Sequence, residues 1–344
     1  MDEPFKTLEF TDGELKLIDQ RQLPATFTYY TCKTYRDVRF AIKDMVVRGA
    51  PAIGTSAAYG VYMAFRELGT DEQDFKEACT FLVEARPTAV NLKWAVDRML
   101  VCYETHRHDN DLDNILLEEA RKIEAEDIAV NKMIGENGLK VVPQNATILT
   151  HCNAGALATS GWGTALGVIK SAFYAKKNIF VYADETRPRL QGARLTAWEL
   201  TQAKIPSKLI PDSAAATLIR DGKIDLVVLG ADRIAKNGDV CNKLGTFALS
   251  VICKHYGVPF YSAAPLSTID FSIEDGSQIP IEERSADEVR FVGKTQVAPL
   301  EMDVYNPSFD VTPHGNVTGI ITEKGIVYPP FKENIEKLQA GISL

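Results

Sequence analysis

The sequence lacks the features of several protein classes. Its six cysteines are scattered without a CxxC pair, and it contains no Walker loop, no HExxH motif and no cysteine cluster with metal-ligand spacing. We therefore expect free thiols, no bound metal and no cofactor. The longest apolar stretch, from Met45 to Phe65, contains Arg48 and Pro51, so we do not expect it to cross a membrane.

An excess of basic charge is also missing. The 344 residues carry a formal net charge of −8, which argues against nucleic acid as the main partner but allows a local basic pocket for a small phosphorylated ligand. Apolar residues make up 45% of the chain and charged residues 24%, as in ordinary globular proteins. Residues Met1 to Pro4 lack the charged-then-apolar layout of a signal peptide, and we expect a cytoplasmic protein.

The apolar pattern divides the chain into two parts. A hairpin that turns at Asp12-Gly13 is predicted over residues 8–18, and a helical period then runs from Tyr35 to about Leu139. Beyond this point strands alternate with helices, which indicates right-handed βαβ units and a parallel sheet. The predicted strands are 146–150, 179–183, 208–210, 225–229 and 259–263, and the predicted helices are 163–177, 193–204, 214–220 and 243–256. The length suits two domains, a mainly helical one with a short β-hairpin (1–140) and an α/β one (141–344).

Two short polar clusters each follow a predicted buried strand. Cys152 follows the strand at 146–150, and Asp232 follows the strand at 225–229. In open α/β sheets the ligand crevice lies beyond the carboxyl ends of such strands. A thiol and a carboxyl group that meet there could form an acid/base pair.

Each of these residues also has an ordinary interpretation. Most cysteines are small buried apolar residues, and Asp232 could be solvated or paired with Arg233. In favour of function, small residues follow Cys152 and precede Asp232, which leaves room for a ligand. Amides exposed before the next helix could also stabilise a thiolate or bind an anion. His151 could be a structural histidine or part of the site.

Other segments offer side chains that could bind an anion or a substrate. The candidates are Arg48, Arg86, Gln191, Asn242 and Lys243. Arg48 precedes a small-residue segment that opens a helix with Pro51 near its first turn, which is a general arrangement for binding phosphate. Glycine-rich helix starts and solvated basic loops are common, so each segment alone is ambiguous.

Three glycines imitate a dinucleotide-binding fingerprint. Gly161, Gly163 and Gly167 precede or open a predicted helix, and acidic residues follow at 184–185. These glycines begin about ten residues after the strand ends, instead of in the tight turn that a pyrophosphate requires. We therefore do not predict a nicotinamide-binding domain.

Taken together, the motifs resemble those of the methylthioribose-1-phosphate isomerases. These enzymes of methionine salvage share a superfamily with regulatory subunits of the eukaryotic translation-initiation exchange factor. The resemblance covers nearly the whole chain. The matching segments are VVRGAPAIG at 46–54, RPTAVNL at 86–92, THCNAG at 150–155, ETRP at 185–188, LQGARLTA at 190–197, GADRI at 230–234, NGD at 237–239, NK at 242–243, APLST at 264–268, IEER at 281–284 and NPSFDVTP at 306–313.

This resemblance implies a small helical N-terminal domain beside a Rossmann-like α/β domain. It also implies that Cys152 is the active-site thiol and that Asp232 is the proton donor. The implied substrate contacts are Arg48, Gly49, Ala50, Arg86, Gln191, Asn242 and Lys243. Members of the family are typically homodimers, and their partner is a small sugar phosphate.

The implied activity is the isomerisation of 5-methylthioribose 1-phosphate, an aldose, to 5-methylthioribulose 1-phosphate, a ketose. Phosphate on the anomeric oxygen prevents simple ring opening to an aldehyde. We hypothesise that Asp232, kept protonated by an apolar wall, donates to the ring oxygen while the Cys152 thiolate removes the C2 proton to give an enol phosphate. A hydride shift from C2 to C1 is the rival route.

Other functions remain open on the same motifs. One is an isomerase of 5-deoxyribose 1-phosphate or ribose 1,5-bisphosphate. The other is a non-catalytic regulatory subunit of the initiation exchange factor, although the presence of both Cys152 and Asp232 speaks against it.

Overall fold

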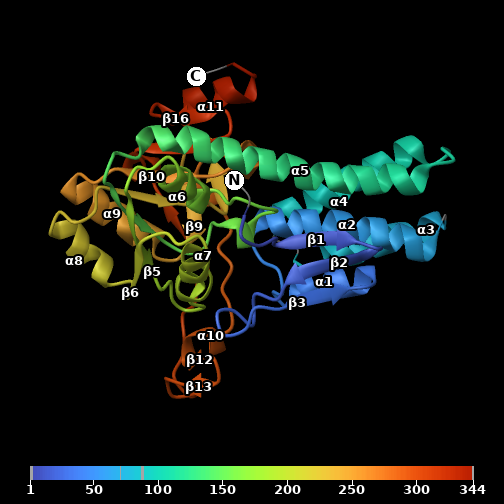
Figure 1. The fold of residues 1–344 in the computed structure, drawn as a ribbon, viewed down its shortest axis with the longest axis horizontal. Coiled ribbons are helices and arrows are strands. Elements are labelled where there is room, and N and C mark those ends of the chain that lie inside the picture. Colours follow the sequence, from blue (N-terminus) through green and yellow to red (C-terminus); the bar gives the residue numbers. More distant parts are fainter. Residues whose placement is uncertain (1–2, 70, 87–88, 343–344) are drawn as a thin grey trace. The chain divides into compact units, whose positions relative to one another are not determined.

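The computed structural model describes residues 3–69, 71–86 and 89–342. The chain divides into two compact units (Figure 1). Unit 1 comprises Met1–Val130 and Gly155–Gly163, and unit 2 comprises Asn131–Ala154 and Thr164–Leu344. The predicted domains, 1–140 and 141–344, stay a prediction, because packing into compact units does not by itself define a folding domain.

Unit 1 combines an antiparallel sheet with a set of helices. The predicted hairpin is confirmed, because β1 (Leu8–Thr11) pairs with β2 (Glu14–Ile18). Asp12 and Gly13 both adopt positive φ, of 54° and 80°, as a tight hairpin turn requires. A third strand, β3 (Tyr29–Cys32), pairs with β2 and was not predicted. The helices are α1 (Tyr35–Lys43), α2 (Ala50–Leu68), α3 (Glu72–Val83), α4 (Val90–His106) and the part of α5 (Leu112–Gly138) that precedes the division between the units.

Helix α2 forms the centre of unit 1. Its residues from Ala52 to Phe65 are all buried, and a helix that is apolar on every side belongs in a core. The small residue Gly54 allows α4 to approach, because a Cβ at Gly54 would lie 2.9 Å from the carbonyl oxygen of Asn91. The long apolar stretch is therefore a core helix, and in the described ranges no helix has the length and hydropathy that a membrane span needs.

Unit 2 is built on a seven-stranded sheet with the order β16-β15-β10-β7-β4-β5-β6. Neighbouring strands from β15 to β6 run parallel, and the edge strand β16 is antiparallel to β15. The strands are β4 (Thr147–Thr150), β5 (Phe180–Asp184), β6 (Ser207–Ile210), β7 (Leu226–Leu229), β10 (Phe260–Ala263), β15 (Gly319–Thr322) and β16 (Gly325–Val327). The predicted α/β class is confirmed with all five predicted strands, whereas β15 and β16 were not predicted.

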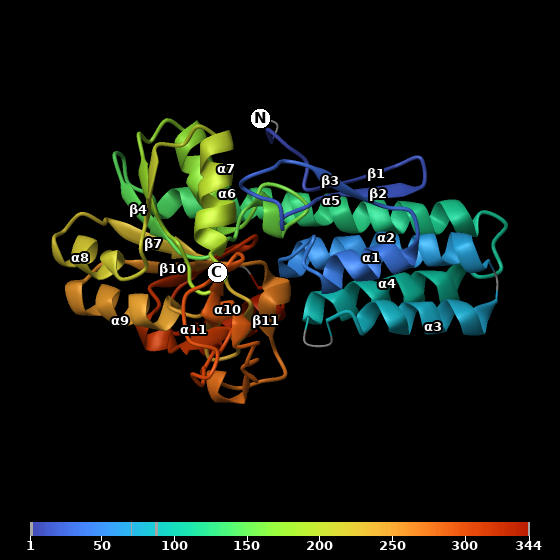
Figure 2. The same cartoon turned by 90° about the horizontal axis from the view of Figure 1, so that it is seen from below.

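Helices cover both faces of this sheet. α6 (Ala165–Tyr174) and α7 (Ala197–Gln202) lie on one face, and α8 (Ala214–Arg220) and α9 (Thr246–Tyr256) lie on the other (Figure 2). From β4 the chain moves outward to β5 and β6, and it then returns to β7 and moves outward in the opposite direction to β10 and β15. A topological switch point therefore lies between β4 and β7, which is where open α/β sheets bind ligands.

A second sheet of unit 2 has the order β11-β8-β9-β14. Its strands are β8 (Arg233–Ala235), β9 (Val240–Lys243), β11 (Ile269–Asp270) and β14 (Phe309–Thr312), and the smaller elements are α10 (Asp287–Arg290), β12 (Phe291–Val292), β13 (Thr295–Gln296) and α11 (Phe331–Gln339). The prediction of a continuous helix over 243–256 is wrong at its start. Lys243 ends strand β9, and helix α9 begins at Thr246.

Candidate active site

The turns that follow β4 and β7 meet at the switch point. Cys152 lies in the first turn and Asp232 in the second, and the two strands pair with Leu149 opposite Val227. A Cβ at Gly230 would lie 2.8 Å from the Cβ of Ala154, so the backbone of one turn packs directly on the other. The room at Gly230 was expected to serve a ligand, but it is filled by Ala154. The structure thus brings together the stretches of chain that carry the thiol and the carboxyl group.

The Cys152 backbone is held by two threonine side chains. The Cys152 N–H donates to Oγ1 of Thr186 at 2.9 Å, and its carbonyl oxygen accepts a hydrogen bond of 2.6 Å from Oγ1 of Thr196. Thr196 ends a single π-helical turn, Gly192–Thr196. Cys152 has a φ of 62°, in the left-handed region that non-glycine residues seldom adopt. The surrounding structure therefore fixes a half-buried thiol on a strained turn, as is common at functional sites.

A buried polar network supports this turn from behind. The side-chain amide of Asn153 donates to Oε1 of Glu199 at 2.9 Å and to Oγ1 of Thr196 at 3.2 Å. The other carboxylate oxygen of Glu199 lies 3.6 Å from Nζ of Lys170, and both side chains of this ion pair are at most 3% exposed. Removing one member would leave a buried charge without its partner, so the network resists rearrangement.

The Asp232 turn is held differently. The Asp232 N–H donates to the carbonyl oxygen of Cys241 at 2.9 Å, at the start of the β8–β9 hairpin. The Asp232 side chain is exposed, so the apolar wall that was expected to keep it protonated is not present in this structure. The neighbouring Arg233 forms an ion pair of 3.5 Å with Asp270.

Asn242 and Lys243 end strand β9, whose start pairs with the strand after Asp232. Both side chains are buried, at 4% and 8% exposed. The Asn242 amide donates to Oγ1 of Thr246 at 3.0 Å. Nζ of Lys243 donates to the carbonyl oxygen of Ser308 at 2.8 Å, and it lies 4.2 Å from the centre of the Phe309 ring. These contacts fix an amide and an ammonium group on the strand next to the Asp232 turn.

Gln191 lies just before the π-helical turn that holds Cys152. Its side chain is 8% exposed, and its Oε1 has no hydrogen-bond partner among the described residues. A buried acceptor without a donor is costly, and such groups usually have a partner. A ligand that brings a hydroxyl group would supply the missing donor.

The remaining candidates, Arg48, Gly49, Ala50 and Arg86, belong to unit 1. Gly49 precedes helix α2 with a φ of 95°, and a Cβ there would lie 2.4 Å from the carbonyl oxygen of Ala158, so only glycine fits. Pro51 occupies the first turn of α2 as predicted. Arg48 and Arg86 are half-buried, and the predicted motif residues Pro87 and Thr88 lie outside the described residues.

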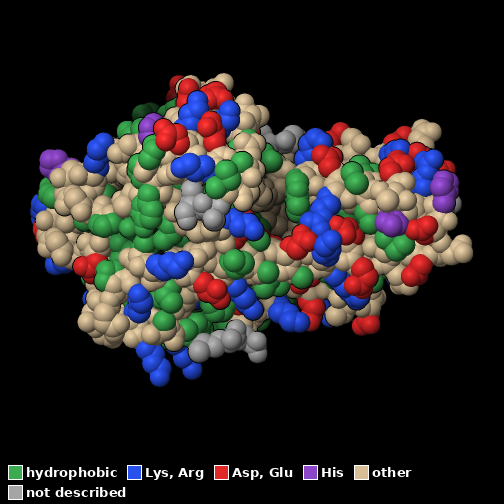
Figure 3. Space-filling model, turned by 90° about the horizontal axis from the view of Figure 1, so that it is seen from above, with side chains coloured by type: hydrophobic (Ala, Val, Ile, Leu, Met, Phe, Trp, Pro, Cys, Tyr) green, Lys and Arg blue, Asp and Glu red, His purple; other side chains and the backbone are tan. Residues whose placement is uncertain are grey.

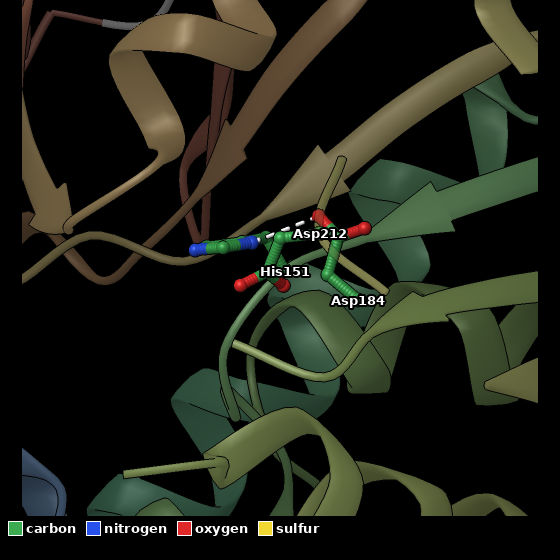
Figure 4. A group of neighbouring side chains, drawn as sticks. All are labelled: His151, Asp184 and Asp212. Carbon is green, nitrogen blue, oxygen red and sulfur yellow. Dashed lines mark hydrogen bonds and ion pairs between the residues drawn. The ribbon is translucent and has the colours of Figure 1, made fainter. Parts of the chain in front are cut away.

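One group at this edge of the sheet was not predicted as a unit. His151, Asp184 and Asp212 lie close together, with Asp184 ending the neighbouring strand β5 (Figure 4). Nδ1 of His151 is 2.8 Å from Oδ2 of Asp184, and Nε2 is 2.9 Å from the carbonyl oxygen of Leu244. The two carboxylate oxygens of Asp212 accept the backbone N–H groups of residues 186 and 187. Both ring nitrogens of His151 and both carboxylate oxygens of Asp212 are thus engaged in hydrogen bonds, whereas Oδ1 of Asp184 has no hydrogen-bond partner among the described residues.

The sequence held one signal for the His151–Asp184 pair. The register of β4 and β5 places Thr150 beside Ala183, so the next residue of each strand is brought to the same place. The pair can therefore be predicted only once it is known that β4 and β5 are neighbours in the sheet.

Comparison with known proteins identifies related chains. A model of the initiation factor 2 subunit family matches residues 46–329. A protein of Caldanaerobacter subterraneus subsp. tengcongensis named methylthioribose-1-phosphate isomerase is 60% identical over 341 residues, which cover 97% of this chain and 99% of that protein.

Two solved structures have the same fold over almost the whole chain. The crystal structure of 5-methylthioribose 1-phosphate isomerase from Pyrococcus horikoshii is 43% identical, with a TM-score of 0.93 over 98% of this chain and 96% of that chain. The structure of translation initiation factor eIF-2B, subunit delta, from A. fulgidus is 42% identical, with a TM-score of 0.90 over 98% of this chain and 99% of that chain.

Proposed function

The chain belongs to the initiation factor 2 subunit family, and from this premise we propose that it is an aldose–ketose isomerase of methionine salvage. Its reaction converts 5-methylthioribose 1-phosphate to 5-methylthioribulose 1-phosphate. Full-length similarity to proteins named for this activity supports the proposal. The observation that carries it is the contact between the turn of Cys152 and the turn of Asp232 at the switch point of the sheet.

The proposed reaction starts with two proton transfers, one to the ring oxygen that is bonded to C1 and one from C2. The Asp232 carboxyl group donates a proton to the ring oxygen as the bond from that oxygen to C1 breaks. The Cys152 thiolate removes the proton from C2, and its electron pair forms the C1–C2 double bond of an enol phosphate. Asp232, now a carboxylate, accepts the proton of the C2 hydroxyl group, and the Cys152 thiol returns a proton to C1. The product is the ketose phosphate, and both side chains regain their first state.

The remaining site residues bind and orient the sugar in this proposal. Arg48 and Arg86 supply positive charge, and Gly49 and Ala50 open helix α2, whose first amides favour an anion. Gln191 needs a donor that a sugar hydroxyl group supplies. Asn242 and Lys243 complete the set of substrate contacts.

Charge on the surface agrees with a small anionic substrate. On the face drawn in Figure 3, acidic and basic side chains are interspersed and no single basic field covers it. A net charge of −8 has the wrong sign for a phosphate-rich polymer.

We also propose a homodimer in the cytoplasm. The segment 297–305 exposes several large apolar side chains, which is unusual for a surface that stays in water. These are Val297, Leu300, Met302 and Tyr305, at 57%, 51%, 64% and 80% exposed. None of the six cysteines, which all lie in the described ranges, forms a disulfide bond, as is usual in a reducing compartment. Light scattering on the full chain tests the dimer, and a monomer at micromolar concentration contradicts it.

A regulatory subunit is the second candidate function, because a protein named as subunit delta has almost the same fold at 42% identity. The deciding experiment measures kcat/KM with methylthioribose 1-phosphate, 5-deoxyribose 1-phosphate and ribose 1,5-bisphosphate. We expect the first to be the best substrate, by about 10-fold or more over the deoxy sugar, since an apolar group of this size contributes about 1–3 kcal/mol. The absence of turnover with all three would favour the regulatory subunit.

A further inference from the structure

Both ring nitrogens of His151 face hydrogen-bond acceptors. Nε2 lies 2.9 Å from the carbonyl oxygen of Leu244, and a carbonyl oxygen cannot donate, so Nε2 carries a proton. Nδ1 lies 2.8 Å from Oδ2 of Asp184, and a second proton must lie between these two atoms. The ring is 2% exposed, so water does not compete for either bond.

From this geometry we infer that His151 is a positioning residue that holds a proton on each ring nitrogen and joins the Cys152 turn to the turn after β9. The Asp184 bond anchors the ring to strand β5, and the Leu244 bond reaches the residue that follows Lys243. The ring also fills the space beside Gly245, where a Cβ would lie 3.0 Å from its Cε1 atom. One side chain thereby fixes the position of the thiol and of the substrate contacts Asn242 and Lys243. The inference rests on the proposed function in naming these groups as parts of the active site.

The surrounding charges favour a doubly protonated ring. The carboxyl groups that face His151 are Asp184 at the end of β5, Asp212 after β6 and Asp310 on β14, and the ammonium group of Lys243 lies beside Asp310. Burial alone lowers the pKa of His151, but the hydrogen bond and charge of Asp184, the bond to Leu244 and the charge of Asp212 together outweigh it, and the net direction of the pKa is upward. The imidazolium form therefore persists above the usual range of a histidine near 6.5.

The positioning role of His151 matters because the next residue in the sequence is Cys152. Cys152 keeps a φ of 62° only while its surroundings hold it there. Two threonine hydroxyl groups hold its backbone on one side, and the His151 ring holds the preceding residue on the other. Loosening the ring lets the turn relax to ordinary φ values and moves the thiol.

A second histidine–carboxylate pair in unit 2 provides a matched control. Nδ1 of His314 lies 2.8 Å from Oδ1 of Asp239, the same separation as in the His151 pair. The His314 side chain is 50% exposed, and it contacts Asp239 and the ring of Phe331, neither of which is proposed for the site.

The first test observes the natural full-length chain by NMR, with ¹⁵N in the histidine rings. Of the five histidines, we expect one to keep protons on both ring nitrogens at a pH about two units above 6.5. Replacement Asp184→Asn identifies this signal as that of His151 by abolishing it. A neutral His151 ring at that pH overturns the inference, whatever the activity of the enzyme.

The second test follows the thiol and the reaction in Asp184→Asn and in the control His314→Gln. We expect Asp184→Asn to slow alkylation of Cys152 by iodoacetamide at least about fivefold and to lower kcat about 10- to 100-fold, because small displacements of reacting groups have effects of this size. His314→Gln should change both rates less than twofold. Equal alkylation rates in the natural chain and Asp184→Asn contradict the positioning role.

These results separate the inference from the proposed function. If Cys152→Ser retains activity, the catalytic assignment fails, but the ring protons and the alkylation rate still decide the role of His151. If Asp184→Asn does not fold, the spectrum of the natural chain still decides the protonation of the ring.

Discussion

The turn after β4 and the turn after β7 touch each other, yet they are built in opposite ways. Side chains from several strands and helices fix the Cys152 turn, and its thiol is half-buried. The Asp232 turn is held by the backbone of its own hairpin, and its carboxyl group is exposed. The difference teaches that the thiol half of the proposed site is preorganised, whereas the carboxyl group of the acid half is open to solvent.

The largest expected effect comes from removing the preorganised thiol. Cys152→Ser should lower kcat at least about 100-fold, because a hydroxyl group is a far weaker base than a thiolate and lost acid/base groups cost this much. The matched control is Cys102→Ser, which changes the other half-buried cysteine, on α4 in unit 1. Steady-state kinetics of both variants measure the effect, and near-normal activity of Cys152→Ser would remove the thiol from the mechanism.

Replacing the exposed acid should separate activity from stability. Asp232→Asn should also lower kcat about 100-fold or more, since the amide cannot donate the required proton. Its free energy of unfolding should change by less than about 0.5 kcal/mol, as for other exposed side chains. Asp221→Asn, at another exposed residue of unit 2, should leave both quantities unchanged. A large loss of stability in Asp232→Asn would contradict the contrast between the two turns.

A substitution behind the Cys152 turn should affect both quantities. Thr196→Val removes the hydroxyl group that binds the Cys152 carbonyl oxygen and the Asn153 amide. We expect a loss of about 1–3 kcal/mol in the free energy of unfolding and about a 10-fold decrease in kcat. Denaturant unfolding and kinetics measure these changes. The control is Thr201→Val, which removes an exposed hydroxyl group that is hydrogen-bonded within α7. It should change neither the free energy of unfolding nor kcat.

The smallest expected effect tests the contact between the two turns. Gly230→Ala places a Cβ 2.8 Å from that of Ala154, so the turns must move apart. We expect a decrease in kcat of about fivefold and a loss of about 1–3 kcal/mol in stability, as for other overpacked contacts. Gly315→Ala, where the new Cβ would be 3.8 Å from Nζ of Lys254, is the control. Unchanged kinetics in Gly230→Ala would show that the spacing of the turns does not matter.

Sequence patterns predicted the parts of the fold that local physics determines. The central strand β7 is a run of buried apolar residues, and each of its four residues is at most 1% exposed. Helix α5 and the hairpin turn at Asp12-Gly13 follow from helical periodicity and turn preference in the same way. Strands β8, β9 and β11 are short and carry few apolar residues. Their formation depends on pairing with other strands, so the local sequence pattern does not predict them.

The site was predictable in its residues but not in its construction. Cys152 and Asp232 stand out because polar clusters follow apolar strands. The His151–Asp184 bond joins residues that are 33 positions apart, so it depends on which strands are neighbours. The return of residues 155–163 to unit 1 is likewise a long-range packing result.

The most direct measurement of the proposed chemistry follows the hydrogen at C2 of the substrate. Substrate that carries deuterium at C2 should give a ketose phosphate with extensive loss of that deuterium to water, because a Cys152 thiol exchanges its proton with solvent before returning one to C1. Complete retention of the deuterium at C1 of the product would contradict the enol route and establish a direct hydride shift instead.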